Sequence, residues 1–495
     1  MLATRLVHDP SLALATDQYE LTMALGYWDA GMAEREAEFH MFFRTPPFGS
    51  GYVVLAGLAP LAEALQAWRF SSGDLDYLGT LRDRAGEPLF PPGFLAYLAD
   101  LRFRCDVDAV PEGTVVFPNE PLVRVRGPLL QAQVLETLVL NTLNFQSLVA
   151  TKAARVCQAA GGDPVVDFGL RRAQGLDGGL SASRAAYLGG CAGTSNVLAG
   201  KLLGIPVLGT HAHSWVMAFD SEQEAFRAFA RAMPNNCVFL VDTYGTLEGI
   251  RNAIAVGHEL QAQGHAMVGI RLDSGDLAAL SRQARAMLDA AGLTEAVIMG
   301  SSDLDEHAIA DLKARGAVVG AWGVGTRLVT AFEEPALNGV YKLAALRDAE
   351  GGPWRHKLKL SEELVKVSVP GLLQVYRCRD ARGRFVGDLV AQEEEDPAAV
   401  ENMVDPNDPS HQFVLDDSGA REPLLRPVFR GGRAVGDLPG LDDVRARVRA
   451  QLAALDEGYR RFEAPREYPI GLSPRLSAHR EALIREARAQ EGAGG

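Results

Sequence analysis

The middle of the chain repeats one pattern, and this repetition limits the possible folds more than any other feature of the sequence. Each unit is a short apolar run, a polar turn and a helical stretch, and the apolar runs occupy residues 165–168, 205–208, 237–241, 267–272, 296–299 and 317–321. Strands that alternate with helices at spacings of roughly 20–40 residues are typical of βαβ units, which form a parallel sheet. About six or seven such units in a row favour a closed or nearly closed β/α barrel over an open sheet.

Capping signals predict where three helices begin. Three pairs fit the capping-box pattern: Asp17 with Glu20, Ser221 with Glu224, and Ser302 with Asp305. In such a box a small polar residue and an acidic residue three positions later satisfy each other's backbone amides. We therefore expect helices to start just after the first residue of each pair.

The segments on either side of the repeat predict a different kind of domain. From residue 38 to about residue 130, β-type runs stand among Gly and Pro turns, which is typical of an α/β domain with a mixed sheet. From residue 357 the chain resumes β-type runs, at 365–369, 373–377 and 384–390, before a charged helical end. We expect this last segment to return to the first domain. The predicted domains are 1–137, 138–350 and 351–495.

Charge and composition argue against several classes of function. The net charge is −14, whereas a nucleic-acid-binding protein presents a basic face. An acidic protein can still bind a small anion, because a few Arg and Lys side chains create a local positive pocket. The five cysteines lie far apart without a CxxC pair, which argues against a zinc site or a disulfide framework. We expect a cytoplasmic protein, since no apolar run reaches the roughly 20 residues of a membrane span and no secretory signal is apparent.

Two carboxylates follow the fourth apolar run, in the turn RLDSGD. Asp273 and Asp276 stand at a strand-to-helix turn, where carboxylates suit the hydroxyls of a sugar or a magnesium ion. Asp276 can equally be a plain N-cap of the following helix. The sequence leaves both interpretations open.

Small residues follow the next two runs, in the turns GSSD (300–303) and GVGT (323–326). Backbone amides in such turns can face a phosphate, helped by the dipole of the following helix. Two turns of this kind next to the acidic turn indicate a ribose-phosphate pocket. The alternative is that both are tight turns without a ligand.

The first two runs end in residues that can bind or react with a substrate. Arg171 beside Phe168 can bind an anionic aromatic acid, since a guanidinium pairs with a carboxylate and a phenyl ring stacks on a flat ring. A surface salt bridge is the alternative for Arg171. The turn GTHAHS contains His211 and His213, and a lone histidine is more often a structural group than a catalyst. Spacing does not tell which of the two is functional.

The order of these motifs resembles the nicotinate phosphoribosyltransferase family. The matching segments are TDQYELTMALGYW, FHMFFR, DFGLRRAQGLDGGLSASRAAYLGGCAGTSN, GTHAHSW, VDTYGT, GIRLDSGD, GSSD, GVGTRLV and KLSEELVKVSVPG. They extend from Thr16 to Gly371 and cover most of the chain. The resemblance implies an irregular β/α barrel of the type II phosphoribosyltransferase kind, packed beside a mixed-sheet α/β domain that the N- and C-terminal segments form together. It also implies a head-to-tail homodimer with shared active sites.

The same resemblance implies the reaction. Nicotinate and phosphoribosyl pyrophosphate would give nicotinate mononucleotide and pyrophosphate in NAD salvage. ATP would be a co-substrate, hydrolysed through a phosphohistidine, and Mg²⁺ would be the cofactor.

The resemblance also assigns residues. His213 matches the histidine that takes a phosphoryl group from ATP, and Asp273 and Asp276 would hold ribose and magnesium. The nicotinate-binding residues would be Tyr19 (from the partner subunit), Phe168, Arg171 and Ser195. The residues for phosphoribosyl pyrophosphate would be Arg44, Arg271, Ser302, Asp303, Gly323, Gly325, Thr326 and Lys359.

One position bears on the choice of pyridine. Related enzymes that use nicotinamide carry an Asp that accepts from the amide, where this chain has Ser195. A carboxylate there would repel nicotinate, so Ser195 favours the acid. Two alternatives stay open: a sister phosphoribosyltransferase that uses nicotinamide or quinolinate, and a non-catalytic regulator that binds nucleotides. The presence of His213, Arg171 and both DSGD carboxylates argues against the regulator.

Overall fold

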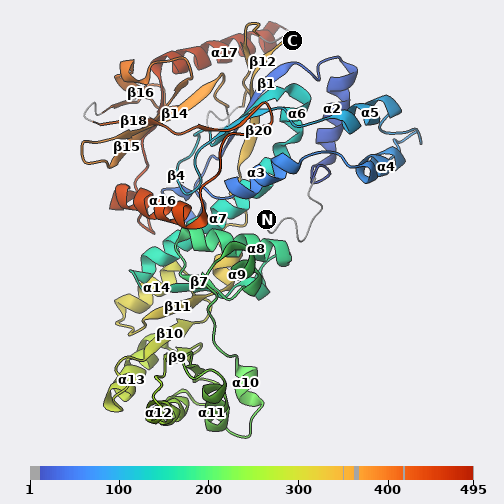
Figure 1. Cartoon of the computed structure of the whole chain (residues 1–495). Coiled ribbons are helices and arrows are strands. Elements are labelled where there is room, and N and C mark those ends of the chain that lie inside the picture. The colour runs from blue at the N-terminus through green and yellow to red at the C-terminus, as the bar shows by residue number, and fades with distance from the viewer. Residues whose placement is uncertain (1–11, 349–350, 362–366, 416–418, 494–495) are drawn as a thin grey trace. The chain divides into compact units, whose positions relative to one another are not determined.

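The chain divides into two compact units. The structure is a computed structural model that describes residues 12–348, 351–361, 367–415 and 419–493. The barrel unit is Val149–Pro335, and the flanking unit combines Met1–Leu148 with Ala336–Gly495 (Figure 1). The C-terminal segment therefore returns to the N-terminal one, as the sequence predicts. The exact domain limits expected from the sequence, 1–137, 138–350 and 351–495, stay a prediction.

A parallel sheet forms the centre of the barrel unit. Among the described residues its strands are β6 (Val165–Asp167), β7 (Gly193–Thr194), β8 (Val238–Leu240), β9 (Gly269–Leu272), β10 (Val297–Ser301) and β11 (Ala321–Val324). Their order is β7-β6-β11-β10-β9-β8, and all neighbouring pairs are parallel. This arrangement confirms the predicted βαβ units of an irregular barrel.

Two of the predicted runs differ from the observed strands. The run at 205–208 is not a named strand, and only Val207 forms an isolated parallel bridge, with Thr194 of β7. The run at 317–321 lies too early, because β11 begins at Ala321 and pairs with β6 from Trp322 onward. Whether the 205–208 run pairs as a strand, and where β11 begins, depends on edge pairing and register. A short apolar run does not reveal either property.

Helices precede, separate and follow these strands along the chain. They are α7 (Glu136–Ala160), α8 (Gly175–Gly189), α9 (Val197–Leu203), α10 (His213–Met217), α11 (Glu222–Ala232), α12 (Thr246–Ala262), α13 (Leu277–Ala290), α14 (Glu306–Ala314) and α15 (Thr326–Val329). The predicted cap of α11 is confirmed, since Ser221 Oγ accepts from the Glu224 amide at 3.2 Å. The predicted cap of α14 is wrong. Asp305, not Ser302, is its N-cap and accepts from the Ala308 amide at 2.7 Å.

The flanking unit contains an antiparallel sheet to which both ends of the chain contribute. Its order is β13-β12-β1-β5-β3-β19-β20. The N-terminal strands are β1 (Glu36–Phe42), β3 (Asp106–Ala109) and β5 (Val123–Pro128). The C-terminal strands are β12 (Val340–Arg347), β13 (Arg355–His356), β19 (Arg426–Arg430) and β20 (Arg433–Ala434). Because β12 pairs with β1 and β19 with β3, the predicted joint domain is confirmed.

A second sheet belongs to the C-terminal segment. Its order is β17-β16-β21-β15-β14-β18, with β15 and β21 parallel and the other neighbours antiparallel. The strands are β14 (Leu373–Arg379), β15 (Phe385–Gln392), β16 (Asn402–Val404), β17 (Gln412–Val414), β18 (Arg421–Pro423) and β21 (Ile470–Leu472). The predicted runs 373–377 and 384–390 correspond to β14 and β15, while 365–369 falls partly outside the described residues.

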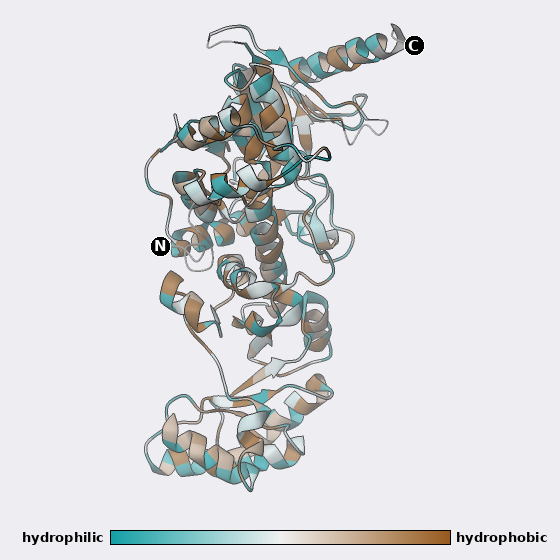
Figure 2. Cartoon of the chain, turned by 90° about the vertical axis from the view of Figure 1, so that its right-hand side faces the viewer, coloured by the Kyte–Doolittle hydropathy of each residue, from teal (hydrophilic) through white to brown (hydrophobic). Residues whose placement is uncertain are grey.

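Helices and a small hairpin complete the flanking unit. The helices are α2 (Gln18–Asp29), α3 (Leu58–Ala67), α4 (Ser72–Thr80), α5 (Pro92–Asp100), α6 (Leu129–Val134), α16 (Leu441–Ala454) and α17 (Pro474–Ala493), and β2 (Val53–Val54) pairs with β4 (Val115–Val116). Figure 2 shows hydrophilic and hydrophobic residues on the same helices. In the described part of the chain, no helix combines the length and the apolar character that crossing a membrane requires.

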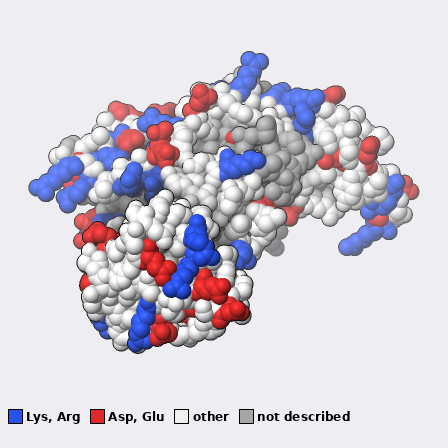
Figure 3. Space-filling view, turned by 60° about the horizontal axis from the view of Figure 1, so that its bottom comes forward, with Lys and Arg blue, Asp and Glu red and all other residues white. Residues whose placement is uncertain are grey.

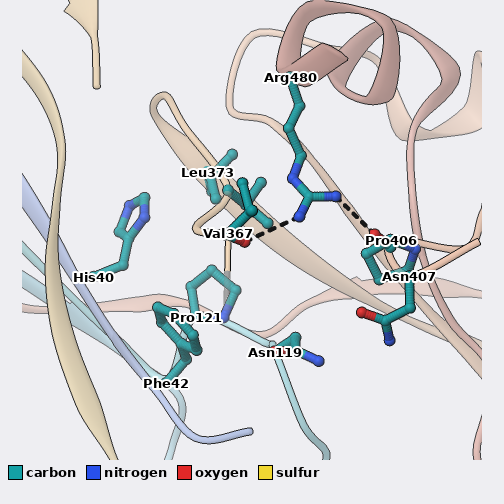
Figure 4. Close-up of a pocket in the computed structure, with 10 residues that line it drawn as sticks. His40, Phe42, Asn119, Pro121, Val367, Leu373, Pro406, Asn407 and Arg480 are labelled. Atoms are coloured by element: carbon teal, nitrogen blue, oxygen red, sulfur yellow. Dashed lines mark hydrogen bonds between the residues drawn. The ribbon is translucent and has the colours of Figure 1, made fainter. Parts of the chain in front are cut away.

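Helix α17 is fixed to its sheet by a buried arginine. Arg480 donates to the Pro406 carbonyl at 2.7 Å and to the Val367 carbonyl at 2.9 Å (Figure 4). A cavity of about 20 Å³ lies beside it, lined also by His40 and Asn119. That volume suits roughly one water molecule, so this cavity is too small for a pyridine acid.

Candidate active site

The loops that leave the carboxyl ends of β6 to β11 carry most of the predicted site residues. In a parallel sheet these ends lie on one side, where functional loops gather. The barrel unit holds Phe168, Arg171, Ser195, His213, Arg271, Asp273, Asp276, Ser302, Asp303, Gly323, Gly325 and Thr326. Three further predicted residues, Tyr19, Arg44 and Lys359, belong to the flanking unit.

A buried carboxylate fixes the start of the loop after β6. Asp167, the last residue of β6, accepts from the Gly169 amide at 2.8 Å and from the hydroxyls of Ser183 and Thr194 at 2.9 and 2.7 Å. The Asn196 side chain donates to Ser183 Oγ at 3.2 Å and extends the network to α9. The loop that bears Phe168 and Arg171 and the turn that bears Ser195 are therefore tied to one hub.

The ring of Phe168 occupies space that a side chain at position 323 would fill. A Cβ on Gly323 would stand 2.6 Å from the Phe168 ring, so glycine is required there for packing. Gly323 is also part of β11 rather than of the turn after it. Its lack of a side chain is thus explained without a phosphate, whereas Gly325 lies in the turn as the N-cap of α15 and Thr326 is the first residue of that helix.

One guanidinium group lies near this ring. The Arg271 guanidinium carbon stands 6.0 Å from the Phe168 ring centroid, and Arg271 donates to Thr210 Oγ1 at 2.5 Å. Burial lowers the pKa of Arg271, and the charge of Arg171 adds to that effect. The Arg271 Nε is buried without an acceptor. Asp273 and Asp242 act in the opposite direction, so Arg271 lies beside the aromatic face among charges of both signs.

Arg171 lies on an exposed turn after β6, in the 3-10 helix Leu170–Arg172. No ion pair among the described residues includes it, so the surface salt bridge left open by the sequence does not form within them. Ser195, in the neighbouring turn, donates its amide to the Asp167 carbonyl at 2.8 Å. The geometry leaves the Arg171 guanidinium available for an anion.

His211 is a structural residue of the barrel. It is 7% exposed, its Nε2 accepts from the Leu240 amide of β8 at 3.2 Å, and its Nδ1 donates to the Ala212 carbonyl at 3.4 Å. Burial lowers its pKa to about 4, so the ring is neutral at pH 7. The side chain thus links the segment after the 205–208 run to β8.

His213 has the opposite surroundings. Its side chain is 41% exposed, its Nδ1 lies 3.2 Å from Thr243 Oγ1, and its Nε2 lies 3.7 Å from Asp273 Oδ2. One ring nitrogen has an orienting hydroxyl and the other faces a carboxylate at the mouth of the barrel. Of the two histidines, only His213 combines access with nearby site residues.

Because His211 must stay neutral in the fold, the protein should lose stability on acidification. Its pKa is depressed from an ordinary 6.5 to about 4, so the stabilisation is complete above pH 6.5 and declines as the pH falls toward 4. Between pH 7.5 and 5.0 the loss from this residue should be about 2 kcal/mol. His211→Gln keeps an acceptor for the Leu240 amide without a titrating group. Urea unfolding at the two pH values should therefore show a smaller loss for this variant than for the wild type.

The matched control for this experiment is His265→Gln, at an exposed position on the same unit. The control should keep the full pH dependence of the wild type. An equal loss in the wild type and in His211→Gln would contradict the structural assignment of His211.

The acidic turn after β9 is organised by a residue that the sequence analysis did not assign. Asp242, in VDTYGT, accepts from the Asp273 amide at 2.9 Å and from Ser274 Oγ at 2.6 Å through one oxygen. Its other oxygen is buried without a partner. Asp273 itself accepts from Ser301 Oγ at 2.5 Å. Its position in the sequence could have marked Asp242 as a site residue, since it directly follows an apolar run, as the other predicted site residues do.

Asp276 makes the contacts of a helix cap. It accepts from the amides of Ala278 and Ala279 at 3.1 and 3.3 Å and pairs with both of its oxygens to Arg315 at 2.8 Å. The structure thus shows the capping contacts that the sequence left open. Within the described residues, no three His, Cys, Asp or Glu side chains gather closely enough to hold a metal ion.

The two small-residue turns follow adjacent parallel strands, β10 and β11. Ser302, in GSSD, has φ 114°, a region that L residues rarely adopt. The helix after GSSD, α14, has 9 residues, whereas α15 after GVGT has only 4. The helix dipole therefore favours an anion mainly at the GSSD turn, which precedes the longer helix.

The three predicted residues of the flanking unit have distinct surroundings. Tyr19 is half exposed, and burial, with Glu136 nearby, raises its pKa to about 12. Arg44 has a buried Nε without an acceptor and lines a cleft of about 710 Å³. Lys359 is exposed, and its amide donates to Ser368 Oγ at 2.9 Å. That these three residues contribute to the site stays a prediction.

The predicted capping box ahead of α2 is wrong. Asp17 is the N-cap by position, but its side chain makes no capping bond. Glu20 is buried and accepts from Thr16 and from the Thr137 hydroxyl, the latter at 2.6 Å. Contacts with a segment more than a hundred residues away replace the local box.

The surface charge agrees with a small-molecule enzyme rather than a nucleic-acid-binding protein. On the face that Figure 3 shows, basic and acidic side chains are interspersed. The net charge of −14 points the same way.

Comparisons with known proteins agree over nearly the whole chain. Models of the nicotinate phosphoribosyltransferase (NAPRTase) family match the N-terminal domain at residues 14–144, the family core at 164–349 and the C-terminal domain at 373–480. The chain is 42% identical to the nicotinate phosphoribosyltransferase of Bacillus subtilis, over 97% of each chain. It is 44% identical to that of Mycobacterium tuberculosis, over 94% of this chain and 92% of the relative.

Solved structures give the same result for the fold. The human nicotinic acid phosphoribosyltransferase superposes with a TM-score of 0.82 at 34% identity, covering 94% of this chain and 99% of that one. A nicotinate-nucleotide pyrophosphorylase from Pyrococcus furiosus superposes with a TM-score of 0.69 at 22% identity over 92% and 99% of the chains, and this similarity concerns the fold alone.

Proposed function

The chain belongs to the nicotinate phosphoribosyltransferase family, and we propose that it transfers the phosphoribosyl group of phosphoribosyl pyrophosphate to nicotinate in NAD salvage. The products are nicotinate mononucleotide and pyrophosphate. The observation that carries the proposal beyond the family is the Arg271 guanidinium beside the Phe168 ring, near enough to Arg171 for the charge of Arg171 to act on it. A flat anionic acid is the ligand that such a pair and such a ring suit.

Nicotinate would stack on Phe168 with its carboxylate toward Arg171. Arg271, first assigned to phosphoribosyl pyrophosphate, is close enough to this ring to share the carboxylate. Ser195 adds no negative charge, and the Asp167 hub orients the loop and the turn that carry these groups. This arrangement favours the acid over the amide.

Phosphoribosyl pyrophosphate would lie across the turns after β9, β10 and β11. Asp273 suits the ribose hydroxyls, while Ser302, Asp303, Gly325 and Thr326 suit the 5′-phosphate. Departure of pyrophosphate builds positive charge on the ribose, so the site mainly has to hold the ring nitrogen in line with the anomeric carbon. No covalent intermediate with the protein is needed for that displacement.

Magnesium fits this site through Asp242 and Asp273. The buried oxygen of Asp242 that lacks a partner supports this assignment, whereas the contacts of Asp276 are taken by α13 and Arg315. Bound magnesium would neutralise charge on the departing pyrophosphate. Asp242 would therefore replace Asp276 in the predicted pair.

ATP would act through His213. A phosphoryl group on this ring adds negative charge beside magnesium and the basic residues, which would reorganise the site for tight binding of phosphoribosyl pyrophosphate. The exposed ring and its Thr243 contact support this role. Tyr19 would reach the same site from the partner subunit of a cytoplasmic homodimer, and Arg44 and Lys359 would bind phosphate groups of phosphoribosyl pyrophosphate. Light scattering at micromolar concentration tests the dimer.

The reaction is tested by supplying phosphoribosyl pyrophosphate with nicotinate, nicotinamide or quinolinate and measuring mononucleotide formation. Nicotinate should be used with the highest kcat/KM. A preference for either of the other pyridines would indicate the sister activity, and no product from any of them would indicate a non-catalytic protein.

Arg171→Ala should weaken nicotinate use specifically. Loss of a charged partner for the carboxylate costs about 2 kcal/mol or more, so kcat/KM for nicotinate should fall by about 30-fold. The KM for phosphoribosyl pyrophosphate should change little. Arg172→Ala is the matched control, because it removes the adjacent exposed arginine. Equal losses in both variants would argue against the assigned role of Arg171.

A further inference from the structure

A chain of ion pairs runs through the barrel unit from its interior toward the GSSD and GVGT turns. Glu306, in the first turn of α14, accepts a hydrogen bond from Arg155 Nε at 2.7 Å and forms an ion pair with Lys152 Nζ, also at 2.7 Å. Lys152 also donates to one oxygen of Glu333 at 2.6 Å, and the other oxygen accepts from Arg327 at 3.0 Å. The side chains of Lys152, Arg155 and Glu306 are at most 1% exposed. The chain is therefore anchored in the core.

Arg327 is the member that joins the two turns. It directly follows Thr326 of GVGT, and the nitrogen that contacts Glu333 also donates to Asp305 Oδ2 at 3.0 Å. Asp305 lies two residues after GSSD and caps α14 with its other oxygen. The turns leave adjacent strands, β10 and β11, which Figure 1 shows beside each other. One nitrogen of Arg327 thus connects the segments that follow both turns.

Ser302 gives an independent indication that the GSSD turn is held in place. Its φ of 114° is a conformation that a residue with a side chain rarely adopts. Such a conformation persists only where the surrounding structure fixes it, and it is most common at functional sites. The anchor at Asp305 begins three residues later along the chain. The strained turn and its anchor are therefore close in sequence as well as in the fold.

We propose that Arg327 is a positioning residue for phosphoribosyl pyrophosphate. Through Asp305 and Glu333 it keeps the GSSD turn in its strained form and in register with GVGT, so that the amides of both turns face the same 5′-phosphate. The inference rests on the proposed function, because that function assigns the 5′-phosphate to these turns.

Arg327→Met should raise the KM for phosphoribosyl pyrophosphate far more than the KM for nicotinate. Methionine keeps the length and the apolar stem but not the charge, so the KM for phosphoribosyl pyrophosphate should rise about tenfold while the KM for nicotinate stays within about twofold. Arg327→Lys retains the charge without the planar geometry and should give an intermediate KM. Calorimetric binding of ribose 5-phosphate, without nicotinate or ATP, should weaken by the same factor as the KM rises.

A second variant tests the part played by Ser302. Glycine adopts φ 114° without strain, so Arg327→Met should cost less affinity for ribose 5-phosphate in a Ser302→Gly background than in the wild type, whatever Ser302→Gly costs by itself. An equal cost of Arg327→Met in both backgrounds would overturn the claim that Arg327 maintains the strained turn.

The matched control is Arg251→Met, which removes an exposed arginine of α12 that pairs with Glu248 in the same unit. This control should leave both KM values unchanged. An equal rise of both KM values in Arg327→Met, or an unchanged affinity for ribose 5-phosphate, would overturn the proposal. A wild-type protein that binds ribose 5-phosphate but does not convert nicotinate would instead refute the proposed function, and the binding comparison would still decide the role of Arg327.

Discussion

Glu306→Gln should lower the free energy of unfolding by about 3 kcal/mol, because the buried Arg155 and Lys152 lose the carboxylate that they share, although Lys152 keeps its pair with Glu333. Glu306 is fully buried, accepts a hydrogen bond from Arg155 and forms an ion pair with Lys152, and both cations are themselves buried. Although burial acts to raise the pKa of Glu306, these two cations hold it below its ordinary value. Glutamine keeps the size of the side chain, so the expected loss is electrostatic rather than a packing defect.

The measurement is the urea midpoint of unfolding at pH 7, compared with Glu248→Gln. Glu248 pairs with Arg251 on the surface of α12, where both side chains are more than half exposed. Such a pair contributes about 0.5 kcal/mol or less, so the control should unfold almost as the wild type does. A loss below about 1 kcal/mol for Glu306→Gln would show that the buried pairs do not stabilise this unit.

These buried pairs illustrate what the sequence could not show. Lys152 and Glu306 lie in two helices separated by several β/α units, so their pairing has no local sequence signal. Asp242 was missed for a related reason: its importance comes from the Asp273 amide on the neighbouring strand. Contacts across the sheet depend on strand order, which a single sequence does not give.

The barrel itself was predictable because its signal is local. Each buried strand is a short apolar run, and each run is followed by a polar turn and a helix, so the parallel sheet follows from the repeat. The mixed sheets of the flanking unit gave no comparable repeat, although the return of the C-terminal segment could be anticipated. Boundaries that depend on register, as at β11, were less accurate.

Local capping patterns had mixed success for a physical reason. At Ser221 the N-cap is confirmed, since its side chain accepts from the Glu224 amide at the start of α11. At Ser302 the backbone has φ 114°, so the helix starts only after Asp305. Near Asp17, Glu20 bonds instead to Thr137. A capping pattern is reliable only where tertiary contacts do not use the same side chains.

His211 and His213 show how burial resolves what spacing leaves open. Both follow the same run, but His211 is enclosed and bonded to the Leu240 amide, while His213 faces Asp273 and Thr243. A residue that must be phosphorylated by ATP needs an accessible ring nitrogen. The structure therefore supports His213 on physical grounds that are independent of the family pattern.

His213→Ala should abolish stimulation by ATP while leaving slow, ATP-independent transfer. The displacement at the ribose does not require ATP, so the variant should fall to the rate that the wild type shows without ATP. When one ligand promotes the binding of another, the affinity typically changes about 5–150-fold. We expect kcat/KM for phosphoribosyl pyrophosphate in the presence of ATP to fall by a factor in that range. The measurement is initial rate with and without ATP, together with acid-labile label on the protein after incubation with γ-labelled ATP.

Two control variants show whether the proposed phosphorylation is specific to the His213 ring. His265→Ala removes an exposed histidine of the same unit and should keep both the label and the stimulation. His211→Gln should also keep the label, because its ring is neutral, buried and already bonded through both nitrogens. Persistent stimulation or labelling in His213→Ala would exclude the phosphohistidine role. If His211→Gln lost the label while His213→Ala kept it, His211 would be the phosphorylated residue. That outcome would contradict the inference that the accessible ring is the one that reacts.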